Sequence, residues 1–144
     1  MINTINLEQA KKLIKNSTKK QIIVKAQDLE FNRKILEYGK FEILLSIEST
    51  AEPDTLRQIN SGFNHVLAKI ASKNNIMVGI DLNEISSLEK KQKAIRLSKI
   101  IQNIKICRKA KTGIKLFNFK DKFDAFSFLI SLGASTQQGK EAIE

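Results

Sequence analysis

The stretch from residue 60 to residue 82 constrains the fold more than any other part of the sequence. It begins with the turn-forming residues 60–62, and apolar residues then recur across 63–71 with the spacing of one helix face. Residues 76–82 are apolar on both faces until Asp81. A run this short and this apolar is typical of a strand that is covered on both sides in a parallel sheet. The stretch therefore predicts a strand-to-helix loop, a helix and a buried strand in immediate succession.

The rest of the chain alternates between strands and helices in the same way. Further strands are predicted at 21–24, 41–47 and 114–119, with a weaker one at 1–5, and helices at 7–16, 28–38, 87–111 and 123–132, before a final segment that opens at Ser135 or Thr136. The expected capping residues are Asn6, Asp28, Ser87 and Asp121 at helix starts, and Gly39 and Gly133 at helix stops. This alternation indicates right-handed βαβ units and a mostly parallel sheet.

The length of the chain limits the size of this sheet. The chain has 144 residues, which suits one domain that spans residues 1–144. A closed eight-stranded barrel needs at least about 200 residues, and the apolar patterns give about five strands. We therefore predict an α/β fold whose parallel sheet is open or forms an incompletely closed barrel.

The formal net charge of +10 comes from 25 Lys and Arg against 15 Asp and Glu, and it is unevenly spread. Residues 73–144 hold 14 basic against 7 acidic residues, whereas residues 1–72 hold 11 against 8. The predicted helix 87–111 carries nine basic residues and one acid, Glu89, although solvated helices usually interleave acids four residues away. Such an excess favours a polyanionic partner, because neutralising phosphates releases counterions. The alternative is an ordinary solvated, lysine-rich surface.

His65 is the only histidine, and it lies in the first turn of the helix after the connection 48–62. That connection is the longest irregular one, and it comes directly after a strand. We therefore expect it at the carboxyl end of the sheet, where α/β proteins bind ligands. Arg57, Asn64 and Lys69 are near His65 in the sequence. We interpret His65 as a contact to phosphate or base rather than as a catalyst; satisfying a loop carbonyl is the structural alternative.

The sequence lacks the motifs that define several enzyme classes. There is no G-x-x-x-x-G-K-[ST] loop and no G-x-G-x-x-G fingerprint, and one histidine with one cysteine cannot make an ordinary metal site. A magnesium site made of carboxylates is conceivable around Asp81, but we favour a turn cap or an ion pair for that residue. Cys107 lies on the predicted buried stripe of helix 87–111, so we expect a small hydrophobe rather than a nucleophile. The other members of that stripe are Leu97, Ile100, Ile101 and Ile104.

Cellular location and any stacking on nucleic-acid bases have weaker signals in the sequence. The single cysteine excludes an internal disulfide, and no apolar run approaches the roughly 18 residues of a membrane span. Cytoplasmic residence is the simplest interpretation. The one Tyr and eight Phe lie mostly on buried patterns, so stacking of splayed bases is not predicted.

Three stretches, in order and spacing, resemble the archaeal ribonuclease P protein component that is related to the eukaryotic thirty-kilodalton subunit. They are residues 60–82 (NSGFNHVLAKIA, NN and VGIDL), residues 99–109 (KIIQNIKICRK), and residues 32–37 with 42–46 (NRKILE and EILLS). The resemblance implies a TIM-barrel-like fold, related to metal-dependent phosphoesterases but without their metal site. It implies a role in removing the 5′ leader from precursor tRNA, with the chemistry done by RNA and magnesium ions and no cofactor in the protein. The implied partners are ribonuclease P RNA, precursor tRNA indirectly, and a ferredoxin-like protein subunit.

The sequence departs from the family pattern in three places. The family normally has a strand–helix unit before the position of Met1, and the chain ends inside the last helix. The segment 118–128 lacks the Ser-Ala turn and the Arg-x-Pro-x-Asp motif usual there, although residues 129–133 fit the next part of the family pattern. These departures predict a shortened barrel, and they do not decide whether the barrel closes.

The sequence supports three hypotheses for function. The first is a ribonuclease P subunit that binds RNA through the basic helix and residues 48–65. The second is a minimal phosphoesterase in which Asp81 and His65 are remnants of a site, and the third is a basic module that meets an acidic protein partner. For the first, the expected RNA-binding residues are Arg33, Arg57, Asn64, His65, Lys69, Lys73, Lys99, Lys105, Arg108 and Lys109.

Overall fold

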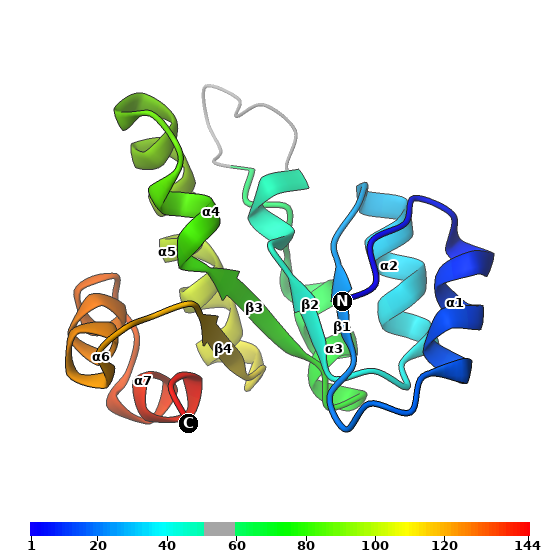
Figure 1. The fold of residues 1–144 in the computed structure, drawn as a ribbon. Helices are drawn as coiled ribbons and strands as arrows, with labels where there is room; N and C mark the ends of the chain where they lie inside the picture. The colour runs from blue at the N-terminus through cyan, green and yellow to red at the C-terminus, as the bar shows by residue number, and fades with distance from the viewer. Residues whose placement is uncertain (51–59) are drawn as a thin grey trace.

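Four parallel strands form a single sheet in the computed structural model, which describes residues 1–50 and 60–144 (Figure 1). The strands are β1 (Ile23–Lys25), β2 (Ile43–Leu45), β3 (Met77–Asp81) and β4 (Ile114–Phe117), and their order in the sheet is the order in the sequence. Each strand thus pairs with the next one along the chain, as in a TIM barrel. In the described part of the chain β1 and β4 are the two edges, so the sheet is open. The predicted parallel α/β fold, shortened and not closed, is confirmed.

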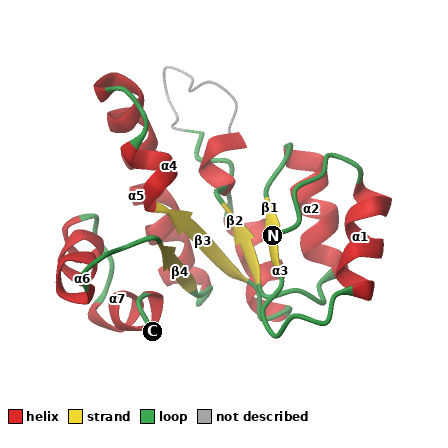
Figure 2. Ribbon diagram, in the orientation of Figure 1, coloured by secondary structure: helices red, strands yellow, loops and turns green. Residues whose placement is uncertain are grey.

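A helix precedes β1, and helices follow each of the four strands (Figure 2). They are α1 (Leu7–Asn16), α2 (Leu29–Tyr38), α3 (His65–Lys73), α4 (Leu82–Ser86), α5 (Lys90–Ala110), α6 (Lys122–Ser131) and α7 (Thr136–Ala142), with a short 3₁₀ helix, η1 (Ile47–Thr50), after β2. Figure 1 shows α3 and α5 behind the sheet, and α3 packs against both α2 and α5. The core between these helices and the sheet includes Leu44, Val78, Ile104 and Leu116.

Side-chain caps place most helix starts where the sequence predicts them. Asn6, Asp28 and Asp121 each accept a hydrogen bond from a backbone N–H in the first turn of α1, α2 and α6, respectively. Ser135, rather than Thr136, caps α7 and forms a reciprocal capping box with Gln138. These predictions are confirmed because a cap is a local interaction between neighbours in the sequence.

Two predicted boundaries around the basic helix are wrong. No helix is predicted between the strand 76–82 and Ser87, but Leu82–Ser86 form the short helix α4, which Asp81 caps by accepting from the N–H of Asn83. Ser87 does not start the long helix; its hydroxyl donates to the carbonyl of Glu84 at the end of α4. The long helix α5 begins at Lys90, and its N-cap Glu89 makes no side-chain cap.

Two further elements differ from their predicted extent. The weak strand at 1–5 is reduced to one parallel bridge between Ile2 and Val24. Helix α3 begins at His65 rather than Phe63, because Asn64 adopts an extended conformation and caps the helix by accepting from the N–H of Leu67.

The buried stripe of α5 is shifted from its predicted position. Ile100, Ile104 and Cys107 are buried as predicted, but Ile101 is 45% exposed and Asn103 is buried instead. Burial raises the pKa of the Cys107 thiol to about 12, so the thiol is a poor nucleophile, as predicted.

Replacing Gly79 with Ala should lower the free energy of unfolding by about 1–3 kcal/mol, because it overpacks the sheet. A Cβ at this position would lie 2.8 Å from Ile43 Cγ2, 2.9 Å from Leu45 Cδ1 and 3.1 Å from Phe117 Cε2. Gly113→Ala is the matched control, since its Cβ meets the flexible side chain of Met77. Urea unfolding measures both variants; equal losses, or no loss for Gly79→Ala, would contradict this packing.

Candidate functional site

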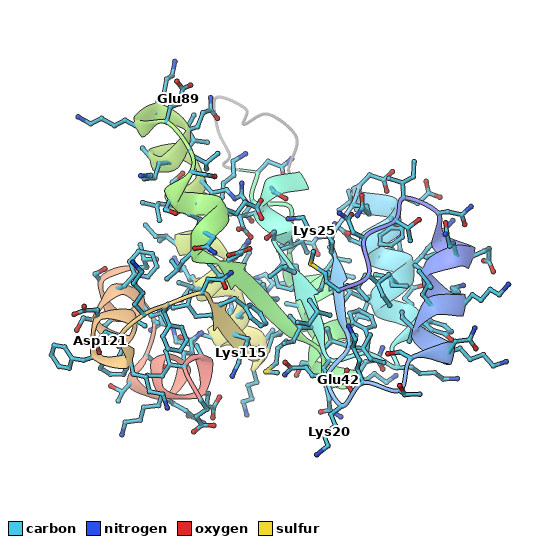
Figure 3. All side chains as sticks on the ribbon, viewed as in Figure 1. Lys20, Lys25, Glu42, Glu89, Lys115 and Asp121 are labelled. Carbon is cyan, nitrogen blue, oxygen red and sulfur yellow. The ribbon has the colours of Figure 1, made fainter. Side chains whose placement is uncertain are left out.

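The carboxyl ends of the strands carry a network of paired charges. Arg96 of α5 reaches two carboxylates: its Nε lies 3.2 Å from Glu48 Oε1 of η1, and its Nη2 pairs with Glu84 Oε1 of α4. Glu84 Oε2 lies 2.8 Å from Lys25 Nζ at the end of β1 and accepts from Ser46 Oγ at 2.9 Å. Figure 3 shows Lys25 near this end of the sheet and Lys20 at the opposite end. The network therefore joins β1, η1, α4 and α5.

The environment shifts the pKa values of the two carboxylates of the network in opposite directions. The Glu48 side chain is 1% exposed, and this burial raises its pKa although Arg96 opposes the shift. Burial would also raise the pKa of Glu84, but hydrogen bonds from Lys25, Arg96 and Ser46 outweigh it and hold the pKa at about 2. Because its ion pairs join four elements of the fold, the network acts as a structural clamp.

Two buried oxygens in this region lack a hydrogen-bond partner among residues 1–50 and 60–144. They are Glu48 Oε2 and Asn103 Oδ1, and both residues line the same small cavity of about 10 Å³. Burying an acceptor without a donor costs folding free energy. The burial of Glu48 therefore depends more strongly on its ion pair with Arg96.

Asp81 makes two hydrogen bonds that hold the end of β3 to its neighbours. Its Oδ1 caps α4 and also accepts a hydrogen bond of 2.7 Å from Asn118 Nδ2. The predicted capping role is therefore confirmed. In the described part of the chain, no group of three or more His, Cys, Asp or Glu side chains is placed to hold a metal ion.

A second cluster lies between the start of α3 and the last turns of α5. A cavity of about 280 Å³ opens there, and we call it the α3–α5 groove. Its lining residues are Phe63, Asn64, His65, Gln102, Lys105, Ile106 and Lys109. On α5 the four lining positions have the i, i+3, i+4, i+7 spacing of one helix face. The groove thus brings together four of the predicted RNA-binding residues: Asn64, His65, Lys105 and Lys109.

The two lysines of the groove place two positive charges at its exposed side. Lys105 and Lys109 are exposed and four residues apart on α5, which places them on adjacent turns. No acidic side chain within the described ranges pairs with either. His65, also exposed, lies across the groove at the first turn of α3. This arrangement suits an anionic ligand.

Two predicted residues of α5 lie outside the groove. Lys99 is only 8% exposed and lines a cavity of about 200 Å³ with Glu48 and Arg96, next to the charge network. Arg108 is exposed and lines a separate cavity of about 460 Å³ with Lys111, between the end of α5 and α7. The basic helix therefore presents its cations in several directions.

The remaining predicted residues are scattered. Lys69 and Lys73 are exposed on α3, and Arg33 is exposed on α2, where its Nε lies 3.2 Å from Glu37 Oε1 of the same helix. Arg57 lies outside the described residues. The structure therefore does not place Arg33 in the α3–α5 groove.

No helix in the described part of the chain is long and apolar enough to cross a membrane.

The fold defines the class of protein before any comparison. A single sheet of parallel strands in sequential order, with a helix after each strand, is a shortened and open relative of the TIM barrel. No family model matches the chain. One chain of the cryo-EM structure of archaeal ribonuclease P with mature tRNA shares the fold, with a TM-score of 0.74 and 21% identity over 98% of this chain and 62% of that one.

In sequence, the chain is similar to ribonuclease P protein component 3. It is 25% identical to that protein from Methanococcus maripaludis strain C7 over 115 residues, which are 78% of this chain and 47% of the relative. It is 27% identical to that from Methanococcus vannielii over 93 residues, or 65% of this chain and 37% of the relative. The chain thus spans about half the length of the curated relatives it matches. These matches confirm the resemblance seen in the sequence.

Proposed function

We propose that this protein is an RNA-binding subunit of ribonuclease P, which stabilises the catalytic RNA for removal of the 5′ leader from precursor tRNA. The observation that carries the proposal is the α3–α5 groove, where Asn64, His65, Lys105 and Lys109 converge without an acidic partner in the described residues. The groove belongs to a chain whose relatives are named ribonuclease P protein component 3. Phosphate contacts by such cations supply affinity and position the protein on RNA.

In this proposal the protein contributes binding and the RNA contributes catalysis with magnesium ions. The phosphoesterase alternative needs His65 and Asp81 in one site. Instead His65 lines the α3–α5 groove, whereas Asp81 caps α4 and accepts from Asn118. A ferredoxin-like protein subunit is the second partner that we propose.

Reconstitution of precursor-tRNA cleavage tests the proposed function. The ribonuclease P RNA of the same organism and its ferredoxin-like subunit are kept in both arms, and this protein is added to one. We expect a severalfold faster cleavage at low magnesium concentration, because the basic protein offsets repulsion between phosphates. The protein without RNA should cleave no precursor tRNA. No acceleration at any magnesium concentration, or cleavage by the protein alone, would refute the proposal.

A further inference from the structure

The α3–α5 groove combines an apolar interior with a basic rim. Phe63 is 5% exposed and Ile106 is partly buried against the core, and both line the cavity. Lys105 and Lys109 lie on the exposed side of the same helix face. The sequence does not predict base stacking, because its aromatic residues lie mostly on buried patterns. The structure nevertheless places Phe63 in the lining of a surface cavity.

The polar groups of the groove suit the edge of a base. Asn64 Oδ1 is engaged in the helix cap, where it accepts from the backbone N–H of Leu67 at 3.0 Å, so the Nδ2 amide is the donor that this side chain can offer to a ligand. The imidazole of His65 is exposed on the next residue and offers both a flat ring and a polar nitrogen. An A-form duplex presents phosphates and 2′-hydroxyls to a protein, and its stacked bases cannot enter such a cavity.

We infer that the α3–α5 groove binds an unpaired nucleotide of RNA, with its base inside the cavity and its flanking phosphates on Lys105 and Lys109. This inference rests on the proposed function and narrows its ligand to bulged or looped-out RNA. Phe63, His65 and Ile106 contact the base, since aromatic and apolar side chains stack on any base irrespective of sequence. The two lysines contact the backbone on either side.

Binding to two short hairpin RNAs tests the inference. One hairpin is fully paired, and the other carries a single bulged 2-aminopurine, whose fluorescence reports stacking. We expect the complete protein to bind the bulged hairpin about tenfold tighter, because stacking of one base contributes a factor of this order. We also expect the fluorescence of the bulged base to change on binding.

The variant Ile106→Lys distinguishes a site that binds a base from a surface that contacts only RNA phosphates. The added cation should strengthen binding to any RNA that only lays its backbone over the surface. If the groove binds a base, the substitution removes an apolar side chain that contacts the base. The variant should then lose the preference for the bulged hairpin. His65→Ala should reduce the preference in the same direction without adding charge. Circular dichroism of each variant checks that it is folded.

The outcomes distinguish the inference from the proposed function. Equal affinity of the native protein for both hairpins, with unchanged 2-aminopurine fluorescence, would overturn the inference and leave RNA binding intact. No binding to either hairpin would overturn both. Displacement of the RNA by an acidic peptide at lower concentration than by the bulged hairpin would also overturn the inference and point to a protein ligand.

Discussion

Replacing Arg96 with Met should lower the free energy of unfolding by about 3 kcal/mol at neutral pH. Arg96 pairs with the buried Glu48, and it shares Glu84 with Lys25. Methionine keeps most of the aliphatic volume but removes the ion pair from the buried carboxylate of Glu48. A loss of this size corresponds to a decrease of roughly 6–12 °C in Tm for a chain of this length.

The loss of unfolding free energy in Arg96→Met should depend on pH. The pKa values of Glu48 and Glu84 determine the direction of this dependence. In the native protein the pKa of Glu84 is lowered from 4.5 to about 2, so its stabilising contribution is present above about pH 4.5 and is lost as the pH falls through about 2. The pKa of Glu48 is raised, so its burial favours folding less as the pH rises from about 4.5. Without Arg96 both folded-state pKa values rise. The part of the difference that comes from Glu48 should therefore shrink as the pH falls from neutral toward about 4.5, and the part that comes from Glu84 should shrink as the pH falls further, from about 4.5 toward 2.

Urea unfolding at several pH values measures this prediction, and Arg33→Met is its control. Arg33 is also paired with a glutamate, but the pair is exposed and lies along one helix, so its removal should cost at most about 0.5 kcal/mol. If Arg96→Met were no less stable than Arg33→Met, the network would not act as a clamp. A deficit that stayed constant with pH would show that poorer packing, rather than uncompensated charge, is the cause.

The parts of the fold that the sequence predicts are those that local interactions determine. Caps such as Asp28 and Asp121 contact residues two or three positions away, so their pattern is visible in the chain. Helix α4 was not predicted because its five residues are too few for a periodic pattern, and the capping role of Asp81 could be assigned only to a turn.

The charge network could not be predicted because its members are distant in the sequence. Glu48 and Arg96 are 48 residues apart, and Lys25 and Glu84 are 59 apart. The convergence of strand ends could have suggested Lys25 and Glu84, since Lys25 ends a strand and Glu84 comes soon after one. Nothing in the chain shows that a side chain in the second turn of α5 reaches back to them.

Single residues of the groove were predicted, but its composition depends on how α5 faces the sheet. A stripe assumed to include Leu97 and Ile101 leaves Lys99 on the open side. The observed stripe runs through Ile100, Ile104 and Cys107, which buries Lys99 and leaves Ile101 exposed. A small rotation of the helix thus decides which lysines reach a ligand.

Replacing both Lys105 and Lys109 with Ala should weaken RNA binding by on the order of tenfold to a hundredfold near 0.1 M salt. Removing each phosphate contact should also flatten the dependence of log affinity on log salt by about 0.7–0.9, or about 1.4–1.8 for the pair. Both side chains are exposed and lack an acidic partner in the described residues, so their removal should leave the fold unchanged. Fluorescence anisotropy with the bulged hairpin over a range of salt concentrations measures both quantities.

The matched control replaces Lys12 and Lys15 of α1 with Ala, which changes the net charge equally. Both are exposed, and Figure 1 shows α1 beyond the β1 edge of the sheet, away from α5. If binding were driven by net charge alone, the two double variants would lose affinity equally. If Lys105 and Lys109 contact phosphate, only their removal should change the salt slope, because counterions are released where cation and phosphate meet. An unchanged salt slope for the Lys105 and Lys109 double variant would show that RNA contacts another surface of the protein, whatever the control shows.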